Sequence, residues 1–265
     1  MNDRRPEPAT RKSSSHVRGP LPLQLELDAV QRILTALRIG NQPCLDIGFR
    51  APVFCRQLRE CCGSWTSAAF TRETCTTLAT DLAEDIARIG SDRRLPFEDK
   101  QFDVVVLALG SLSGDPASDS ALVHECHRVL KVSGYLILTV EYAKPLGLVT
   151  LLNLRPLMAS VGGHYSEAAL FDLLKTGFDW LGLRTYCRFW VQLVRLWVAR
   201  QRPDKQNHLL AAVYWAARIG DYLTFFARGY LVTAYGRRKG WRPRQTPKLA
   251  DGRNISETVL RKLGH

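Results

Sequence analysis

The stretch LPFEDKQFDVVVLALGSL, Leu95–Leu112, decides the fold of this chain. Its centre, FDVVVLAL, is an almost continuous apolar run rich in β-branched residues, as expected of a parallel strand buried on both faces. Downstream, residues 118–131 have apolar side chains at helical spacing, with Ser118 as the expected cap. Residues 132–142 then indicate a second buried strand. Such alternation predicts a doubly wound α/β sheet, in which ligands bind at the carboxyl ends of the strands.

The same alternation is present upstream of this stretch. Apolar residues at helical spacing between 27 and 37 predict a helix that Gly40 closes, and the buried strand Cys44–Ile47 follows. Further along, the pattern predicts a helix, a weaker strand and another helix, over 53–61, 65–71 and 74–86. We therefore expect one α/β domain over residues 21–187.

Several motifs in this order resemble class I S-adenosylmethionine-dependent methyltransferases of the small-molecule type. They are Leu-Pro-Phe and Phe-Asp-Val-Val within RRLPFEDKQFDVVV, and then RVLKVSG, Arg128–Gly134, where the family has Arg-Val-Leu-Lys-Pro-Gly-Gly. The stretch GGHYSEAALFDLLKTGFDWLGLRTY extends the resemblance over roughly residues 40–187. It implies a Rossmann-like methyltransferase sheet, S-adenosyl-L-methionine as the cofactor and methyl transfer to a small-molecule substrate.

The loop after the first strand departs from the family pattern. By resemblance, Asp46 and Gly48 approach the methionine part of the cofactor, whereas Arg50 and Pro52 stand where the family has two further glycines. Glycine there lets the backbone come close to a ligand. Arg50 either obstructs the loop or takes over the carboxylate of the cofactor, and Pro52 is suited to begin the following helix. The loop is thus either a working site with unusual parts or a remnant of one.

The other cofactor contacts also follow from the resemblance. Thr71 stands where the family has the acid that holds the ribose hydroxyls, with Glu73 nearby as a substitute. Asp92 matches an acid that faces the adenine amino group, and Leu109 begins the loop beneath the cofactor. The implied cofactor-binding residues are Asp46, Gly48, Arg50, Thr71, Asp92 and Leu109.

No residue is assigned as a catalytic acid or base, because positioning alone supplies much of a methyl transfer from a sulfonium. His164 is a candidate base or substrate contact near the expected pocket, and its alternative role is in a capping loop. Glu141 and Tyr142 are further candidate substrate contacts. The pair His124 and His127 has helical spacing but is interpreted as a surface and packing pair, so no metal site is expected.

Basic residues are concentrated at the C-terminal end. Of the net charge of +12, residues 184–265 carry seventeen Lys or Arg against four acids, a surplus of 13, which leaves −1 for the rest. This segment also contains aromatic-rich stretches, YCRFWVQLVRLWVARQR among them, that predict a helical extension over 188–246. Basic helices with Trp and Phe on another face suit an anionic membrane surface, and the alternative is a lid or dimer surface packed on the domain. Binding of nucleic acid is permitted by the charge but has no recognition motif to support it.

Two functions therefore stay open. One is S-adenosylmethionine-dependent methyl transfer to a small, apolar or membrane-associated molecule, and the alternative is a catalytically silent methyltransferase-like scaffold or membrane-associated module. The seven scattered cysteines favour a reducing, cytoplasmic compartment, with peripheral membrane contact as the open question. The charged, Pro- and Ser-rich residues 1–20 indicate a disordered tail rather than a signal peptide, and 247–265 form a second tail.

Overall fold

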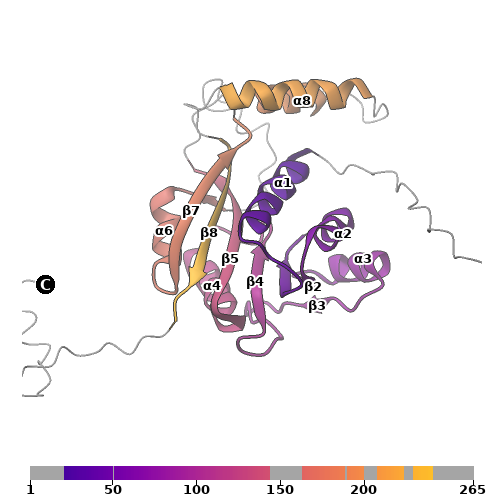
Figure 1. Cartoon of the computed structure of the whole chain (residues 1–265). Coiled ribbons are helices and arrows are strands. Elements are labelled where there is room, and N and C mark those ends of the chain that lie inside the picture. Colours follow the sequence, from indigo (N-terminus) through magenta and orange to yellow (C-terminus); the bar gives the residue numbers. More distant parts are fainter. Residues whose placement is uncertain are drawn as a thin grey trace, which may run out of the picture.

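The computed structural model describes residues 21–49, 51–143, 163–188, 190–199, 208–223 and 229–240. An eight-stranded sheet forms the centre, with the strand order β3-β2-β1-β4-β5-β8-β7 and β6 paired to β5 (Figure 1). The elements before residue 130 are α1 (Leu21–Ala36), β1 (Pro43–Ile47), α2 (Pro52–Cys61), β2 (Ser64–Ala69), α3 (Arg72–Leu82), β3 (Ala87–Arg88), β4 (Phe102–Leu107) and α4 (Pro116–Val129). Those after it are β5 (Leu130–Tyr142), β6 (His164–Tyr165), α6 (Glu167–Leu174), β7 (Phe178–Tyr186), α7 (Trp190–Ala199), α8 (His208–Leu223) and β8 (Leu231–Arg238). The predicted doubly wound α/β sheet is confirmed.

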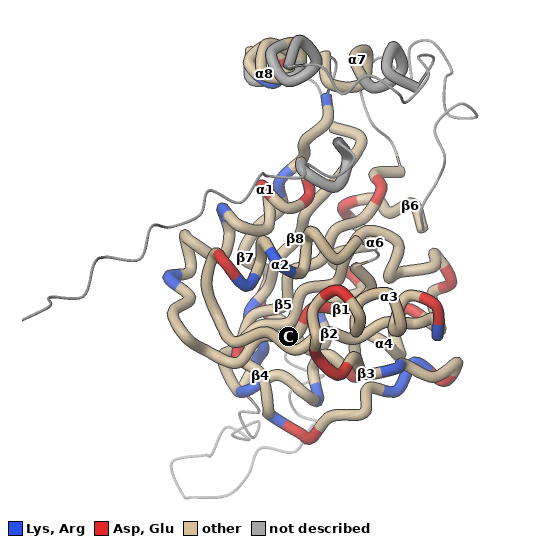
Figure 2. The backbone as a smooth tube through the Cα atoms, turned by 90° about the vertical axis from the view of Figure 1, so that its right-hand side faces the viewer, with Lys and Arg blue, Asp and Glu red and all other residues tan. Residues whose placement is uncertain are grey.

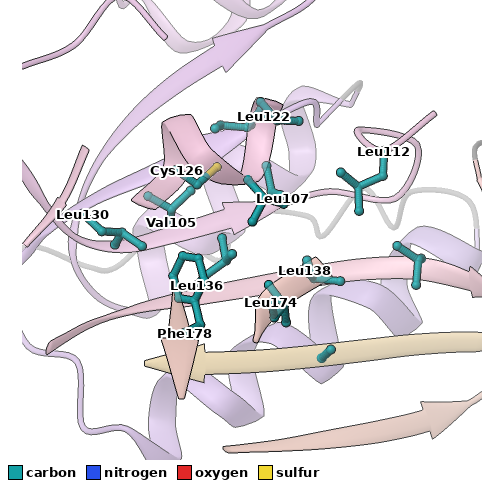
Figure 3. Packing of buried hydrophobic residues seen from close by; sticks show 14 of the residues in the cluster. Val105, Leu107, Leu112, Leu122, Cys126, Leu130, Leu136, Leu138, Leu174 and Phe178 are labelled. Carbon is teal, nitrogen blue, oxygen red and sulfur yellow. The ribbon is translucent and has the colours of Figure 1, made fainter. Parts of the chain in front are cut away.

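The sheet is buried on both faces, which explains the apolar run in β4. Val104 and Val106 pack with α1, α2 and α3, whereas Val105 and Leu107 pack with α4 and α6. Figure 1 shows these helices on opposite sides of the sheet, and Figure 3 shows the packing against α4. Because neighbouring residues of a strand point to opposite faces, every position from Val104 to Leu107 needs an apolar side chain, whereas Asp103 is only partly buried and pairs with Lys131.

Helix starts follow local capping chemistry. Ser166 caps α6, since its hydroxyl accepts a hydrogen bond from the N–H of Ala169. Pro52 lies in the first turn of α2, as its missing N–H allows. The expected cap at Ser118 is wrong. The carboxylate of Asp115 accepts the Ser118 N–H and caps α4, and Pro116 begins the helix.

The largest difference from the sequence-based expectation lies at the C-terminal side. Residues Leu231–Arg238 were expected in the helical extension, but they form β8, which inserts antiparallel between β5 and β7. The alternating sequence LVTAYGRR explains this, because Val232 and Ala234 enter one core cluster while Leu231 and Tyr235 face the other side. Of the described part of the extension, only α7 and α8 are helical.

Helices α7 and α8 lie side by side beyond the carboxyl ends of β4 and β5 (Figure 2). Their inner residues, Val191 and Ala217 among them, pack in one cluster with Leu109 and Leu231. The carboxylate of Asp221 accepts hydrogen bonds from the N–H groups at the start of α7, including that of Trp190 at 2.6 Å. None of the described helices has the length and apolarity needed to cross a membrane.

Candidate functional site

A pocket of about 280 Å³ opens at the carboxyl ends of β1, β2 and β4. It is lined by Gly48, Ala69, Phe70, Thr71, Thr74 and Gly110. The chain winds from β1 toward β2 on one side and reaches β4 on the other, so the pocket lies where the winding of the sheet reverses. This switch point is where doubly wound sheets bind their ligands.

Gly48 makes the turn that forms the floor of the pocket. Its φ of +81° is one that side-chain-bearing residues rarely adopt, and an added Cβ would collide with Ser111 Oγ. The turn is fixed on both sides, because Gly48 N donates to Ala68 O at 2.9 Å and Ser111 Oγ donates to Ile47 O at 3.0 Å. The structure therefore places Gly48 at the pocket, with its backbone open to a ligand.

Asp46 lies behind this turn and is fully buried. Its Oδ2 accepts from Ser67 Oγ at 2.7 Å and lies 3.5 Å from Arg59 Nη1, while Oδ1 accepts from Cys55 Sγ at 3.5 Å. Burial raises the pKa of Asp46 to about 6, against the opposing effect of Ser67 and Arg59. Asp46 is absent from the described residues that line the pocket. Its contacts instead hold the end of β1 to β2 and α2 beneath the Gly48 turn.

Phe49, Arg50 and Ala51 form the middle of the loop between β1 and α2. Phe49 is buried and stacks on Phe54, with ring centroids 5.9 Å apart, so its side chain belongs to the core. Arg50 lies outside the described residues. Its predicted contact with the cofactor carboxylate stays a prediction, and Ala51 in extended conformation leads into Pro52 and α2.

Thr71 borders the pocket at the end of β2. Its hydroxyl caps α3 by accepting the N–H of Thr74 at 3.2 Å, and the two threonine hydroxyls are 2.7 Å apart. Glu73 lies exposed in the first turn of α3 and does not line the pocket. The lining residues in the described part of the chain include no carboxylate, and the polar side chains at this edge are the hydroxyls of Thr71 and Thr74.

Asp92 lies away from the pocket, whereas its neighbour Arg93 contacts residues around it. Asp92 is exposed and its Oδ1 accepts from Arg94 N at 3.2 Å, without lining the pocket. Arg93 was not predicted. Its guanidinium lies 4.8 Å from the ring centroid of Phe70 and donates to Ser111 O at 3.2 Å. Arg93 thus ties together two walls of the pocket, and its only sequence signal is a position just before Leu-Pro-Phe.

Leu109 lies in the loop after β4, as predicted, next to the pocket residue Gly110. Its N–H donates to Oε1 of Glu26, a fully buried carboxyl of α1, at 2.7 Å. The other oxygen, Oε2, has no hydrogen-bond partner in the described part of the chain. Burial raises the pKa of Glu26 to about 8, so this acid is largely neutral at pH 7. No motif surrounds Glu26, and no local pattern indicates that this carboxyl is buried beside the pocket loop.

The candidate substrate contacts meet at the carboxyl end of β5. Glu141 Oε2 accepts from the hydroxyl of Tyr230 at 2.8 Å and lies 3.3 Å from Nε2 of His164. The neighbouring side chain of Tyr142 reaches Glu167 instead, at 3.3 Å. Of the pair His124 and His127, interpreted from the sequence as surface and packing residues, His127 packs edge-on against Phe178. The described residues contain no group of three or more potential ligands placed to hold a metal ion.

A parallel sheet with strand order 3-2-1-4-5, a glycine turn after β1 and a pocket at the switch point define a Rossmann-like cofactor-binding domain. Residues 45–138 match the profile of the methyltransferase domain family, and this part of the chain is a class I S-adenosylmethionine-dependent methyltransferase domain. The expected family is confirmed, and with it S-adenosylmethionine as the family cofactor. No curated protein matches the chain.

Solved structures share the fold at low sequence identity. One is a Galdieria sulphuraria protein that was assigned as a sarcosine dimethylglycine methyltransferase. It is 16% identical to this chain with a TM-score of 0.52, and the alignment covers 80% of this chain and 83% of that protein. Geranyl diphosphate C-methyltransferase from Streptomyces coelicolor is 13% identical with a TM-score of 0.50, covering 80% and 77%. The [4+2]-cyclase SpnF is 20% identical with a TM-score of 0.51, covering 80% and 81%. A protein named for a cyclisation thus shares this fold, and the reaction has to be argued from the site.

Proposed function

We propose that the protein transfers a methyl group from S-adenosylmethionine to a small, apolar molecule. The observation that carries this proposal is the Gly48 turn at the switch-point pocket. The residues present fit the cofactor. Gly48 and Gly110 offer bare backbone, Ala69 and Phe70 form an apolar wall, and Thr71 and Thr74 each offer a hydroxyl group for a ribose. When bound, S-adenosylmethionine supplies a methyl group on a positively charged sulfur, which is already a strong electrophile.

Titration calorimetry with S-adenosylhomocysteine tests this proposal directly. We expect saturable binding by the wild-type chain and at least a tenfold weaker affinity for Gly48→Ala, whose Cβ would collide with Ser111 Oγ. Gly40→Ala is the matched control, because a Cβ at Gly40 meets no atom within 4 Å. A folded wild-type chain that binds neither S-adenosylhomocysteine nor S-adenosylmethionine at millimolar concentration contradicts the enzyme proposal.

A silent methyltransferase-like module is the second candidate. It is favoured by Arg50 and Pro52 in place of loop glycines and by the lack of a carboxylate among the residues lining the pocket. Thermal melting separates the two, since a ligand at about 100 times its dissociation constant stabilises the folded state by about 2.7 kcal/mol. An upward shift of the melting temperature with cofactor argues against the silent module, and an unchanged melting temperature supports it.

We further propose that the outer face of α7 and α8 contacts an anionic membrane surface, which would bring an apolar substrate to the site. Large apolar side chains stay exposed there, with Trp215 at 68% and Leu223 at 69%, and the C-terminal segment carries the basic surplus. Exposed tryptophans suit the membrane interface, and the basic residues of this segment lie mainly in the stretches of sequence that flank α7 and α8.

Flotation with vesicles containing phosphatidylserine tests the membrane contact. We expect the wild-type chain to float with these vesicles at low salt and Trp215→Ser to float less. Phe171→Ser is the control, because Phe171 is exposed to 50% on α6, another part of the molecule. Equal flotation of wild type and Trp215→Ser, or none at low salt, contradicts this part of the proposal.

A further inference from the structure

Strand β6 pairs with the same edge of β5 as β4 does, but nearer to the carboxyl end of β5. β4 pairs with β5 up to Leu138, and at Glu141 the partners of β5 are Leu231 of β8 and His164 of β6. A strand has two edges, and β8 occupies one of them along its whole pairing with β5. β6 must therefore lie in line with β4, beyond its carboxyl end.

This placement brings His164 beside the loop that carries the pocket. Gly163 N donates to Leu112 O at 3.0 Å, and Gly163 packs against the backbone of Gly114. The same loop, which runs on from β4, contains the pocket residue Gly110. His164 follows Gly163 directly, so its backbone lies beside the loop that also carries the pocket residue Gly110.

His164 and Glu141 point to the side of the sheet that α1 covers. The next residue after His164, Tyr165, lies in the core on the α4 and α6 side, where its hydroxyl donates to Asp119. Neighbouring residues of a strand point to opposite faces, so His164 faces the α1 side. Ile137 packs on the α1 side too, and Glu141 follows it at an even spacing on the same strand.

The pair has the form of an oriented base. Glu141 is buried, with 1% of its surface exposed, and its Oε2 is 3.3 Å from His164 Nε2 and 2.8 Å from the Tyr230 hydroxyl. The side chain of His164 is 35% exposed and accessible to a small molecule. A carboxylate that accepts the Nε2 proton fixes the tautomer, and Nδ1 then carries the lone pair that can take a proton.

Resting on the proposed methyl transfer, we propose that His164, positioned by Glu141, is the general base that deprotonates the acceptor, and that the acceptor carries an ionisable hydroxyl group such as a phenol. The acceptor oxygen forms the bond to the methyl carbon while the carbon–sulfur bond breaks, its electron pair staying on sulfur. The hydroxyl proton moves to Nδ1 of His164 and from there to water. Glu141 balances the positive charge of the imidazolium. The buried Glu26 is not accessible enough for this role.

The first readout needs no turnover. 4-Nitrophenol is the probe, and its visible nitrophenolate band is recorded with the protein saturated in S-adenosylhomocysteine, at a pH where the free probe is mostly neutral. We expect the wild-type chain to raise this band and His164→Gln to lose the increase, with unchanged affinity for S-adenosylhomocysteine. His124→Gln is the matched control, since His124 is exposed on α4. It should behave as the wild type.

The second readout is methyl transfer from S-adenosylmethionine to the same phenol. General bases contribute about 10²–10⁴-fold, so His164→Gln should lower kcat by that factor without a matching rise in KM. Glu141→Gln keeps the shape of the carboxylate and should lower kcat less, because it removes the orienting charge only. Equal rates for wild type and His164→Gln, or no nitrophenolate increase in wild type that binds S-adenosylhomocysteine, overturn this inference alone. Absence of S-adenosylhomocysteine binding overturns the proposed function itself.

Discussion

Glu26→Gln should remove a pH dependence of stability that the buried carboxyl creates. Burial raises the pKa of Glu26 from 4.5 to about 8 in the folded chain, and the N–H of Leu109 only partly opposes this. The folded state therefore holds a proton that the unfolded chain releases between these two pH values. The stability that the protonated Glu26 contributes is fully present below pH 4.5. This contribution falls as the pH rises through the window and is lost as the pH passes the pKa of the folded state.

The size of the effect follows from the two pKa values. Between pH 5 and pH 8 the free energy of unfolding should fall by several kcal/mol, on the order of 3 to 4, on account of Glu26 alone. Glutamine has nearly the same shape and no titrating proton, so the difference between wild type and Glu26→Gln isolates this contribution. Relative to the wild type, the variant should gain stability on the order of 3 to 4 kcal/mol as the pH rises from 5 to 8.

Urea unfolding at both pH values gives these free energies by linear extrapolation. Glu73→Gln is the control, because it makes the same chemical change at an exposed position of α3 and should leave the pH dependence as it is. A difference between wild type and Glu26→Gln that is the same at pH 5 and pH 8 would show that this carboxyl does not change its protonation on folding. Burial would then not raise the pKa of Glu26.

Three further predictions concern the supports of the site. Arg59→Ala should destabilise the fold by on the order of 3 kcal/mol at pH 8 and less at pH 5, because Asp46 can take up a proton at low pH; urea unfolding at the two pH values measures this. Arg93→Ala should weaken S-adenosylhomocysteine binding several-fold in calorimetry with little change in melting temperature, since it unties Phe70 from the loop after β4; equal affinity would contradict this role. Asp221→Ala should cost about 1 kcal/mol by removing the cap of α7, and faster hydrogen exchange confined to the first turn of α7 would identify the cause.

The parts of the fold that could be predicted are those in which local sequence and tertiary position agree. β4 is apolar from Val104 to Leu107 because both faces are covered there, and Pro52 lies in the first turn of a helix, where its missing N–H is tolerated. β8 was missed because its strand-like alternation follows a long aromatic and basic helical region and is short. Asp115 was missed as a cap because Ser118 is also a capping residue type, and only the position of Pro116 distinguishes the two.

The candidate site was predictable where it depends on the backbone and less so where it depends on distant side chains. Gly48 could be identified because its turn needs a residue that tolerates positive φ. Glu26 is separated from Leu109 by 83 residues, and no local pattern indicates such a contact. Arg93 follows β3 and contacts Phe70, which follows β2. This contact depends on the pairing of the two strands and therefore has no local sequence signal either.

The insertion of β8 between β5 and β7 sets an order of assembly during synthesis. Strands β1 to β5 emerge first and can pair with one another, while the outer edge of β5 stays open. Its partner arrives almost a hundred residues later, as the 94-residue separation of Thr139 and Thr233 shows. β7 has no place in the sheet before then, because it pairs with β8. A nascent chain that stops before Leu231 therefore exposes an unpaired strand edge, the kind of surface that recruits chaperones or other chains.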